Sequence, residues 1–264
     1  MYKGISTVCC YMSKINECIR LVKENDFGAI DFFIAPPKIT LENIVEFINE
    51  AKKAGMSIFT LKAPSFIENL CSIIPQIHDL TYHEYLKTLM IAKETGGKAV
   101  IVKPGMMFFV EKKCRDLIQK RFLDSLYSLT EYAEKNKILL LLENYYYPYE
   151  VLRNVRDFVW FAETLMTQYE NIGFALNIPH FLEARNKITE LIHPRNRIVL
   201  EKIKLIYVGL RSSPWEYSMN VSSSSTIISG VKEILKEADP EFLVLATPSE
   251  PILRLLIDQL EGSL

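Results

Sequence analysis

The feature that most constrains the fold of this chain is a repeated alternation of short apolar runs with segments of helical periodicity. Parallel strands that are buried on both faces read as continuously apolar, and each is followed by a crossover helix. Eight runs of four to six residues have this character. They are predicted as strands at residues 5–9, 29–34, 57–61, 99–102, 138–143, 172–176, 205–210 and 242–245.

Apolar residues at helical spacing lie between and after these runs. The helical patterns cover residues 15–22, 41–48, 85–92, 112–135, 151–168, 182–191, 199–203, 227–236 and 251–260. Thr40 is predicted to cap the second of these helices. The alternation predicts an α/β fold, a single-domain (β/α)8 TIM barrel over residues 1–264, and this length is typical of that fold. A doubly wound open sheet is the competing architecture, but the chain lacks the Gly-rich turn that such sheets carry after their first strand.

Composition and charge exclude several classes of partner. Hydrophobic residues make up 49% of the chain, and the formal net charge of -1 predicts no general attraction to nucleic acid or to an anionic membrane. No apolar stretch reaches the ~20 residues of a membrane span, and the first residues read as a strand rather than a secretory signal. Five cysteines without zinc-like spacing favour reduced thiols and a cytoplasmic location. Adjacent Cys9 and Cys10 are expected on opposite faces of the first strand.

Polar side chains follow several of the predicted strands, at the points where chemistry concentrates in a barrel of this kind. Glu143 is the carboxylate among them, and it directly follows an apolar run. Three cations, one amide and one imidazole are expected to share the same mouth. These residues are Lys62, Lys103, Arg211, Asn177 and His180. Each alone is typical of an ordinary structural residue, and their joint placement is what indicates a pocket.

Two segments near this mouth have open interpretations. Residues 212–226 include four consecutive serines and are predicted as a polar loop, either a linker or a phosphate-binding or lid loop. Tyr145 begins a tyrosine-rich stretch after Glu143, and it is expected either to wall a ligand pocket or to shield the mouth of the barrel.

Short motifs at the strand ends resemble those of the xylose-isomerase-like barrel superfamily, which contains sugar-phosphate isomerases and epimerases and the endonuclease IV group. The resemblance runs from residues 29–33 to the last helix. Its most specific parts are Leu-Leu-Glu-Asn at 141–144, Val-Lys-Pro-Gly at 102–105, Leu-Lys-Ala-Pro at 61–64 and Asn-Ile-Pro-His at 177–180. In the family these match a Glu-Asn strand end, His-Pro-Gly, His-Ala-Pro and Asp-x-x-His.

The chain departs from this family at the metal ligands. The resemblance implies a divalent metal bound by Glu, Asp, His and Glu from strands five to eight. Here Glu143 is retained, Asn177 takes the Asp position, Gly209 falls near the His position, and Ala246 or Thr247 takes the final Glu position. One carboxylate and one imidazole are too few strong ligands for a tight divalent site. The sequence therefore predicts no bound metal and no other cofactor.

Lys62 and Lys103 stand where endonuclease-type members carry histidines, and a protonated lysine cannot ligate a metal. Lysine ammonium groups would instead keep positive charge beside Glu143 and stabilise a carboxylate, phosphate or enolate of the ligand. Glu143 is then predicted as a general base and His180 as its proton partner. A Schiff base on either lysine is a less favoured alternative.

Three functions follow from these expectations. The favoured one is a divergent sugar-phosphate isomerase or epimerase with a metal-free, lysine-lined pocket for a small anionic carbohydrate-like ligand, in which Asn177, Arg211 and Tyr145 contact the substrate. The alternative is a catalytically inactive barrel that serves as a binding or scaffold protein. An endonuclease IV-like nuclease is least favoured, because that reaction relies on a metal cluster.

Overall fold

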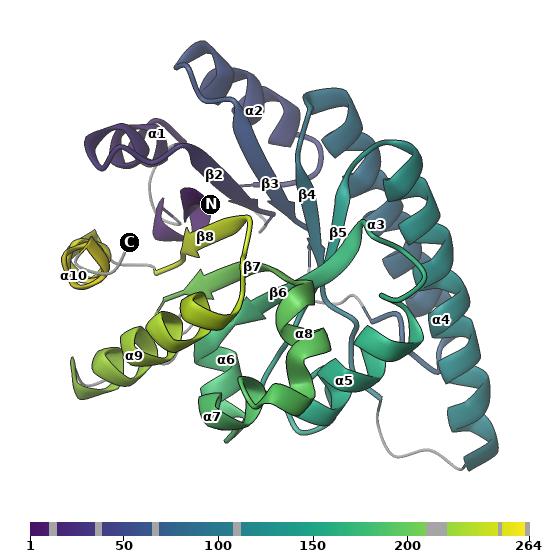
Figure 1. Ribbon diagram of the computed structural model, residues 1–264. Helices are drawn as coiled ribbons and strands as arrows, with labels where there is room; N and C mark the ends of the chain where they lie inside the picture. The colour runs from purple at the N-terminus through teal and green to yellow at the C-terminus, as the bar shows by residue number, and fades with distance from the viewer. Residues whose placement is uncertain are drawn as a thin grey trace.

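A computed structural model shows a closed barrel of eight parallel strands in the order β1 to β8, surrounded by helices (Figure 1). The structure describes residues 1–10, 15–34, 39–64, 69–107, 112–209, 221–247 and 250–261. The predicted (β/α)8 TIM barrel is confirmed. The strands are β1 Tyr2–Ser6, β2 Ala29–Phe33, β3 Ile58–Lys62, β4 Ala99–Val102, β5 Leu139–Glu143, β6 Ile172–Asn177, β7 Ile203–Val208 and β8 Phe242–Leu245.

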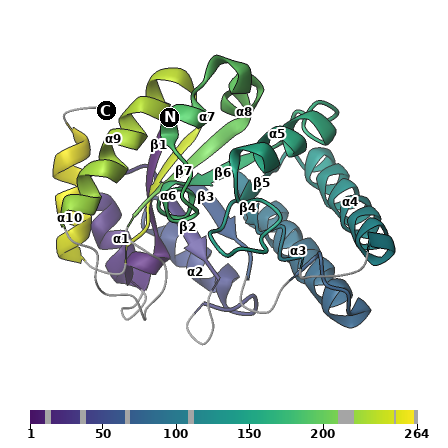
Figure 2. The same cartoon turned by 90° about the horizontal axis from the view of Figure 1, so that it is seen from below.

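The helices follow the chain around the barrel, so that the colour in Figure 1 runs from purple through teal and green to yellow. In both ribbon views the long helices α3 and α4 lie side by side, and so do the first and last helices (Figures 1 and 2). The helices are α1 Ile15–Glu24, α2 Ile44–Lys53, α3 Pro75–Thr95, α4 Lys112–Lys135, α5 Val155–Thr164, α6 Ile178–Glu183, α7 Ile188–Leu191, α8 Arg197–Lys202, α9 Val221–Glu237 and α10 Glu250–Glu261, with 3-10 turns η1 Thr7–Cys10 and η2 Pro194–Asn196.

Alternate residues of each strand face two different apolar regions, which explains why the strands read as continuous apolar runs. One set packs outward against the helices in a large core. The other set fills the inside of the barrel and consists of Ala99, Ile101, Leu141, Ala175, Leu205, Tyr207, Phe242 and Val244. The interior below the mouth is therefore packed mostly with apolar side chains, with Asp31 and Thr60 as a buried polar pair among them.

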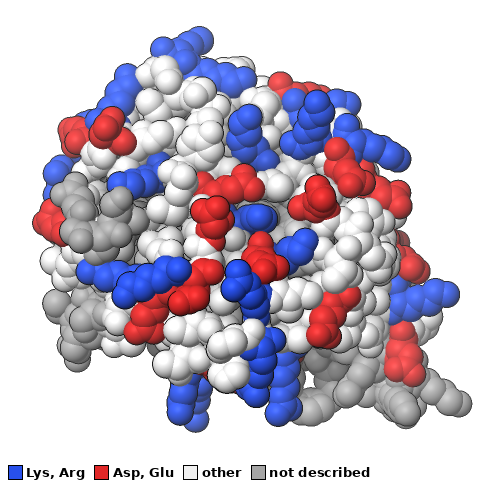
Figure 3. All heavy atoms as spheres, in the orientation of Figure 1, with Lys and Arg blue, Asp and Glu red and all other residues white. Residues whose placement is uncertain are grey.

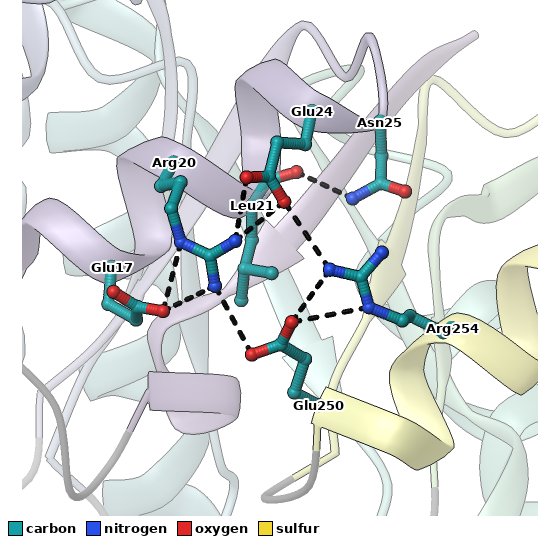
Figure 4. A network of polar contacts seen from close by, with 7 residues as sticks. All are labelled: Glu17, Arg20, Leu21, Glu24, Asn25, Glu250 and Arg254. Atoms are coloured by element: carbon teal, nitrogen blue, oxygen red, sulfur yellow. Dashed lines mark hydrogen bonds and ion pairs between the residues drawn. The ribbon is translucent and has the colours of Figure 1, made fainter.

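An exposed network of ion pairs joins the first and last helices where the ring of helices closes (Figure 4). Arg20 of α1 binds Glu17 and Glu24 of its own helix and reaches Glu250 of α10 at 3.2 Å. Arg254 of α10 in turn pairs with Glu250 at 2.7 Å and with Glu24 at 3.4 Å. The network links the two ends of the chain across the surface.

Three sequence predictions about local structure are wrong. The first strand begins at Tyr2 and ends at Ser6, so Cys9 and Cys10 lie in the turn η1 rather than on opposite faces of a strand. Thr40 is not the helix cap, because α2 begins at Ile44 with Asn43 at the N-cap position. The serine-rich segment is not wholly a loop, since residues 222–225 lie in the first turns of α9. Residues 212–220 of that segment lie outside the described residues.

The surface agrees with the near-zero net charge. On the face shown in Figure 3, lysine and arginine side chains alternate with aspartate and glutamate rather than forming a patch of one sign. None of the described helices is both long enough and apolar enough to cross a lipid bilayer.

Candidate functional site

The centre of the candidate site is an ion pair between the last residues of β3 and β5. The ammonium nitrogen of Lys62 lies 2.7 Å from Oε1 and 2.7 Å from Oε2 of Glu143. Glu143 is buried, and only 11% of the Lys62 side chain is exposed. The sequence-based expectation that a lysine stands beside this carboxylate is therefore met by Lys62.

Asn177, the last residue of β6, holds the same carboxylate from another side. Its Nδ2 donates to Oε1 of Glu143 at 2.9 Å, while its Oδ1 accepts from the backbone N–H of His180 at 3.1 Å and caps α6. Asn144 locks the backbone here, because its Oδ1 accepts from the Asn177 N–H at 2.7 Å and its Nδ2 donates to the Asn177 carbonyl at 3.1 Å. The orientation of the Asn177 amide is consequently fixed at both ends.

His180 lies fully buried in the first turns of α6. Its Nδ1 lies 3.2 Å from the carbonyl oxygen of Asn144, and its ring meets that of Tyr145 edge-on at 4.2 Å between centroids. Burial lowers the pKa of His180 to about 4, even though the charge of Glu143 acts in the opposite direction. The imidazole is therefore neutral at neutral pH, and donation from Nδ1 to the carbonyl makes Nε2 an acceptor.

Two opposing effects act on Glu143. Burial raises the pKa of this carboxyl, but the charge of Lys62 and the hydrogen bonds from Lys62 and Asn177 outweigh burial. The net pKa lies below the ordinary value, so Glu143 is ionised at neutral pH and able to accept a proton.

Lys103 reaches the same mouth but has a different carboxylate partner, Glu150, at 2.8 Å. Its ammonium also lies 3.9 Å from the centre of the Tyr145 ring, which places Tyr145 between Lys103 and His180. The loops after β4 and β5 bring Glu150 in, because Met107 donates to the carbonyl of Tyr149 at 2.8 Å. Glu150 was not predicted from the sequence, because it lies in a polar, tyrosine-rich stretch that does not mark any one residue as functional.

A second buried carboxylate, Asp31 of β2, lies inside the barrel and was also missed. Thr60 donates to its Oδ1 at 2.8 Å, and its Oδ2 has no well-oriented hydrogen bond among the described residues. Burial raises the pKa of Asp31, while the Ser6 hydroxyl and the Lys62 ammonium act to lower it. Tyr207 of β7 is buried nearby, and burial together with the charge of Asp31 raises its pKa well above the ordinary value.

The donor set does not fit a divalent metal. Both oxygens of Glu143 are engaged by an ammonium, and Asn177 turns its nitrogen rather than its oxygen toward the site. A Cβ at Gly209 would lie 1.8 Å from the carbonyl oxygen of Ala246, so a histidine at that position would require the backbone to move. In the part of the chain that the structure describes, no three His, Cys, Asp or Glu side chains converge in a way that could hold a metal.

Of the predicted site residues, the structure brings together Glu143, Lys62, Asn177 and His180, with Lys103 and Tyr145 beside them. Arg211 lies outside the described residues. Thr247 is buried, and its backbone N–H points to Cys9 Sγ at 3.3 Å rather than to Glu143.

Comparison with known proteins agrees with this barrel. The model of the xylose isomerase-like TIM barrel family matches residues 19–221, which is more than half of the chain. The chain therefore belongs to the xylose isomerase-like TIM barrel family. No curated protein matches the sequence.

Several solved structures share the fold at low sequence identity. A D-tagatose 3-epimerase-like protein superposes with a TM-score of 0.77 at 16% identity, covering 100% of this chain and 98% of its own. The 3-keto-D-glucoside 4-epimerase YcjR from E. coli gives a TM-score of 0.69 at 16% identity, with 99% and 98% coverage. The IOLI protein with a binding zinc atom gives 0.71 at 15% identity, with 100% and 96% coverage. At these identities the likeness shows the fold alone.

Proposed function

We propose that the protein is an isomerase- or epimerase-type enzyme that acts on a carbohydrate-like substrate without a metal ion. The observation that carries the proposal is the buried pair of Glu143 and Lys62 at the carboxyl ends of the strands, 2.7 Å apart. Glu143 takes the proton from the carbon next to the substrate carbonyl. The Lys62 ammonium stabilises the negative charge that then develops on the carbonyl oxygen.

The ion pair has two opposing consequences for this reaction. Lys62 keeps Glu143 ionised, yet the same attraction makes the carboxylate a weaker base. The balance favours catalysis because an ammonium that attracts the carboxylate in the ground state turns toward the enediolate oxygen in the transition state. Neutral His180 accepts a hydrogen bond from a substrate hydroxyl and does not supply a proton at neutral pH.

Isomerisation is the simpler of the two reactions for this site. One carboxylate can remove a proton and return it to the neighbouring carbon on the same face of an enediolate, while the hydroxyl proton passes from one oxygen of the enediolate to the other. Inversion of one carbon needs a proton donor on the opposite face. Glu143 is the carboxylate placed for the first route, so we favour movement of the carbonyl between adjacent carbons.

The substrate is further proposed to carry an anionic group that binds Lys103, with Arg211 as a second cation and Asn177 and Tyr145 as contacts. In the described part of the mouth each lysine already has a carboxylate partner. An anion must therefore compete with Glu150 for Lys103. Burial raises the pKa of Glu150, which favours its protonation when an anion approaches.

The test is exchange of substrate protons in D2O. Protein with EDTA is incubated with a panel of aldoses, ketoses and their phosphates, and loss of the proton next to the carbonyl is followed by NMR. Wild-type protein is expected to incorporate deuterium, and Glu143→Gln to lose ~100-fold or more of the rate. Glu250→Gln, the same change in the surface network, is the matched control. Equal rates for a sugar and its phosphate would remove the anionic group from the proposal.

The second candidate is a catalytically inactive barrel that serves as a binding or scaffold protein. One observation favours it: both lysines are paired with carboxylates, and an active site that has lost its activity would contain the same ion pairs. Absence of exchange with every sugar in the panel, together with a tight protein partner, supports this candidate over the enzyme.

A further inference from the structure

We propose that Glu143, Asp31, Tyr207 and Phe33 form a binding site for an ammonium group, here called the ammonium cage. The cage holds the Lys62 ammonium as its resident cation, at the position where relatives in this family hold a metal. Its catalytic consequence rests on the proposed function, because the resident cation is the group that stabilises the enediolate. The binding properties of the cage do not depend on that function.

The contacts of the Lys62 ammonium are those of a monovalent, tetrahedral cation. It lies 2.7 Å from both oxygens of Glu143, 4.9 Å from the centre of the Tyr207 ring and 5.2 Å from the centre of the Phe33 ring. Aromatic faces within about 6 Å attract ammonium groups through their quadrupole. Aromatic faces do not replace the six or more oxygen ligands that hard divalent ions take.

The pairing register of the strands positions the aromatic rings and the carboxylate around the Lys62 ammonium. Phe33 of β2 pairs in register with Lys62 of β3, so the two side chains emerge side by side at the mouth. Tyr207 of β7 pairs with Asn177 of β6, and Asn177 holds the Glu143 carboxylate. The aromatic walls and the carboxylate are therefore positioned by the barrel itself rather than by loops.

Asp31 supplies a second carboxylate from below. It pairs in register with Thr60, two residues before Lys62 on the same face of β3. The Lys62 ammonium acts on the charge of Asp31, and Oδ2 of Asp31 has no well-oriented hydrogen bond among the described residues. A buried ammonium that is bound by the Glu143 carboxylate and faced by two aromatic rings, with Asp31 further down the same side of the sheet, is compensated for its loss of water.

A cage of this kind makes a specific prediction when the lysine is shortened. Lys62→Ala removes Cγ, Cδ, Cε and Nζ, which together have the length and charge of propylammonium. Glu143, Asp31, Tyr207 and Phe33 stay in place, so propylammonium is expected to fill the space. A divalent ion is not expected to do so, because Asn177 turns its amide nitrogen to the site and Gly209 leaves no room for a histidine ligand.

The experiment compares cations by thermal shift and isothermal calorimetry on Lys62→Ala. Methylammonium, ethylammonium and propylammonium chlorides are tested against NaCl at equal ionic strength, and MnCl2 and ZnCl2 are tested alone. The Tm of Lys62→Ala is expected to rise progressively from methylammonium to propylammonium. The double variant Lys62→Ala/Glu143→Gln is expected to bind propylammonium at least about tenfold more weakly than Lys62→Ala does. Wild-type protein and Lys62→Met, whose side chains fill the space, are controls without a shift.

Three results would overturn the cage: stoichiometric Mn or Zn on wild-type protein, tight divalent binding by Lys62→Ala, or no effect of propylammonium beyond that of NaCl. If Lys62→Ala does not fold alone, it is refolded with propylammonium or with NaCl, and only propylammonium is expected to yield folded protein.

Measuring proton exchange separates the role of the cage in catalysis from its ability to bind a cation. Where wild-type protein exchanges substrate protons, propylammonium is expected to restore exchange to Lys62→Ala. Binding of propylammonium without restored exchange overturns the catalytic role and supports the cage. Absence of exchange in wild-type protein removes the proposed function and leaves the cation-binding result standing.

Discussion

Lys103 forms its ion pair with Glu150, at 2.8 Å, and not with the carboxylate at the end of β5. Only 1% of the Glu150 side chain and 10% of the Lys103 side chain are exposed, so each charge depends on the other. The pair also joins two loops that belong to neighbouring strands, β4 and β5. Among the described residues, the mouth of the barrel therefore contains two separate ion pairs, with Tyr145 and His180 next to the second.

The Lys103–Glu150 pair leads to a first prediction about stability. Glu150→Gln leaves a mostly buried ammonium without its counter-charge, which typically costs about 3–5 kcal/mol. Urea unfolding should show a loss of that size. The double variant Lys103→Met/Glu150→Gln removes both charges and is expected to recover a large part of it. Additive effects of the two single changes would show that the residues do not interact.

Much of the fold could be predicted from sequence because each strand carries its own apolar signal. The runs at 99–102 and 242–245 match β4 and β8 to the residue, and the pattern at 112–135 matches α4. The first strand was predicted too far along the chain, because Thr7, Val8 and Cys9 have side chains that favour strands, yet they form a 3-10 turn. Local propensity could not distinguish those two outcomes.

Site residues could be predicted only where their position at or just after the end of a single predicted strand marked them. Glu143, Lys62, Asn177 and His180 follow directly from their positions in the runs. Glu150 did not, because its contact with Lys103 depends on two loops pairing across the mouth. Asp31 did carry a signal, since a charged residue within an apolar run must face the inside of the barrel with a partner.

A second prediction concerns pH, with His180 as the titrating group. The unfolded chain takes up a proton on this imidazole near pH 6.5, whereas the folded protein resists protonation until about pH 4. Between these values the unfolded state binds more protons, so stability falls as pH drops from 6.5 toward 4 and is constant with respect to this group above 6.5. The contribution across the window is roughly 3 kcal/mol.

Urea unfolding at several pH values checks this. His180→Gln should flatten the slope between pH 4 and 6.5, while His83→Gln, at an exposed position, should keep the slope of the wild-type protein. An unchanged slope in His180→Gln would show that another group is responsible.

The ion-pair network between α1 and α10 yields a third prediction. The side chains of its members are between 36% and 52% exposed, so salt screens their attraction. Arg254→Gln is expected to lower the Tm slightly at low ionic strength and to have no effect in 1 M NaCl, where the Debye length is about 3 Å. Differential scanning calorimetry at both salt concentrations measures this, with Arg195→Gln, in the weak 4.0 Å pair with Glu190, as the comparison. A salt-independent loss in Arg254→Gln would point to packing rather than charge.

A fourth prediction tests the close contact that excludes a side chain after β7. A Cβ at Gly209 would lie 1.8 Å from the carbonyl oxygen of Ala246, a backbone atom held in place by the bond from the Ala246 N–H to the Val208 carbonyl at 2.8 Å. Gly209→Ala must therefore push apart the ends of β7 and β8, and overpacking of this kind costs about 1–3 kcal/mol or more. Gly28→Ala is the matched control, because nothing lies within 4 Å of its added Cβ. Equal stability of the two variants in urea would mean that the strand ends can separate freely. The explanation that a steric clash excludes a histidine ligand at position 209 would then be wrong.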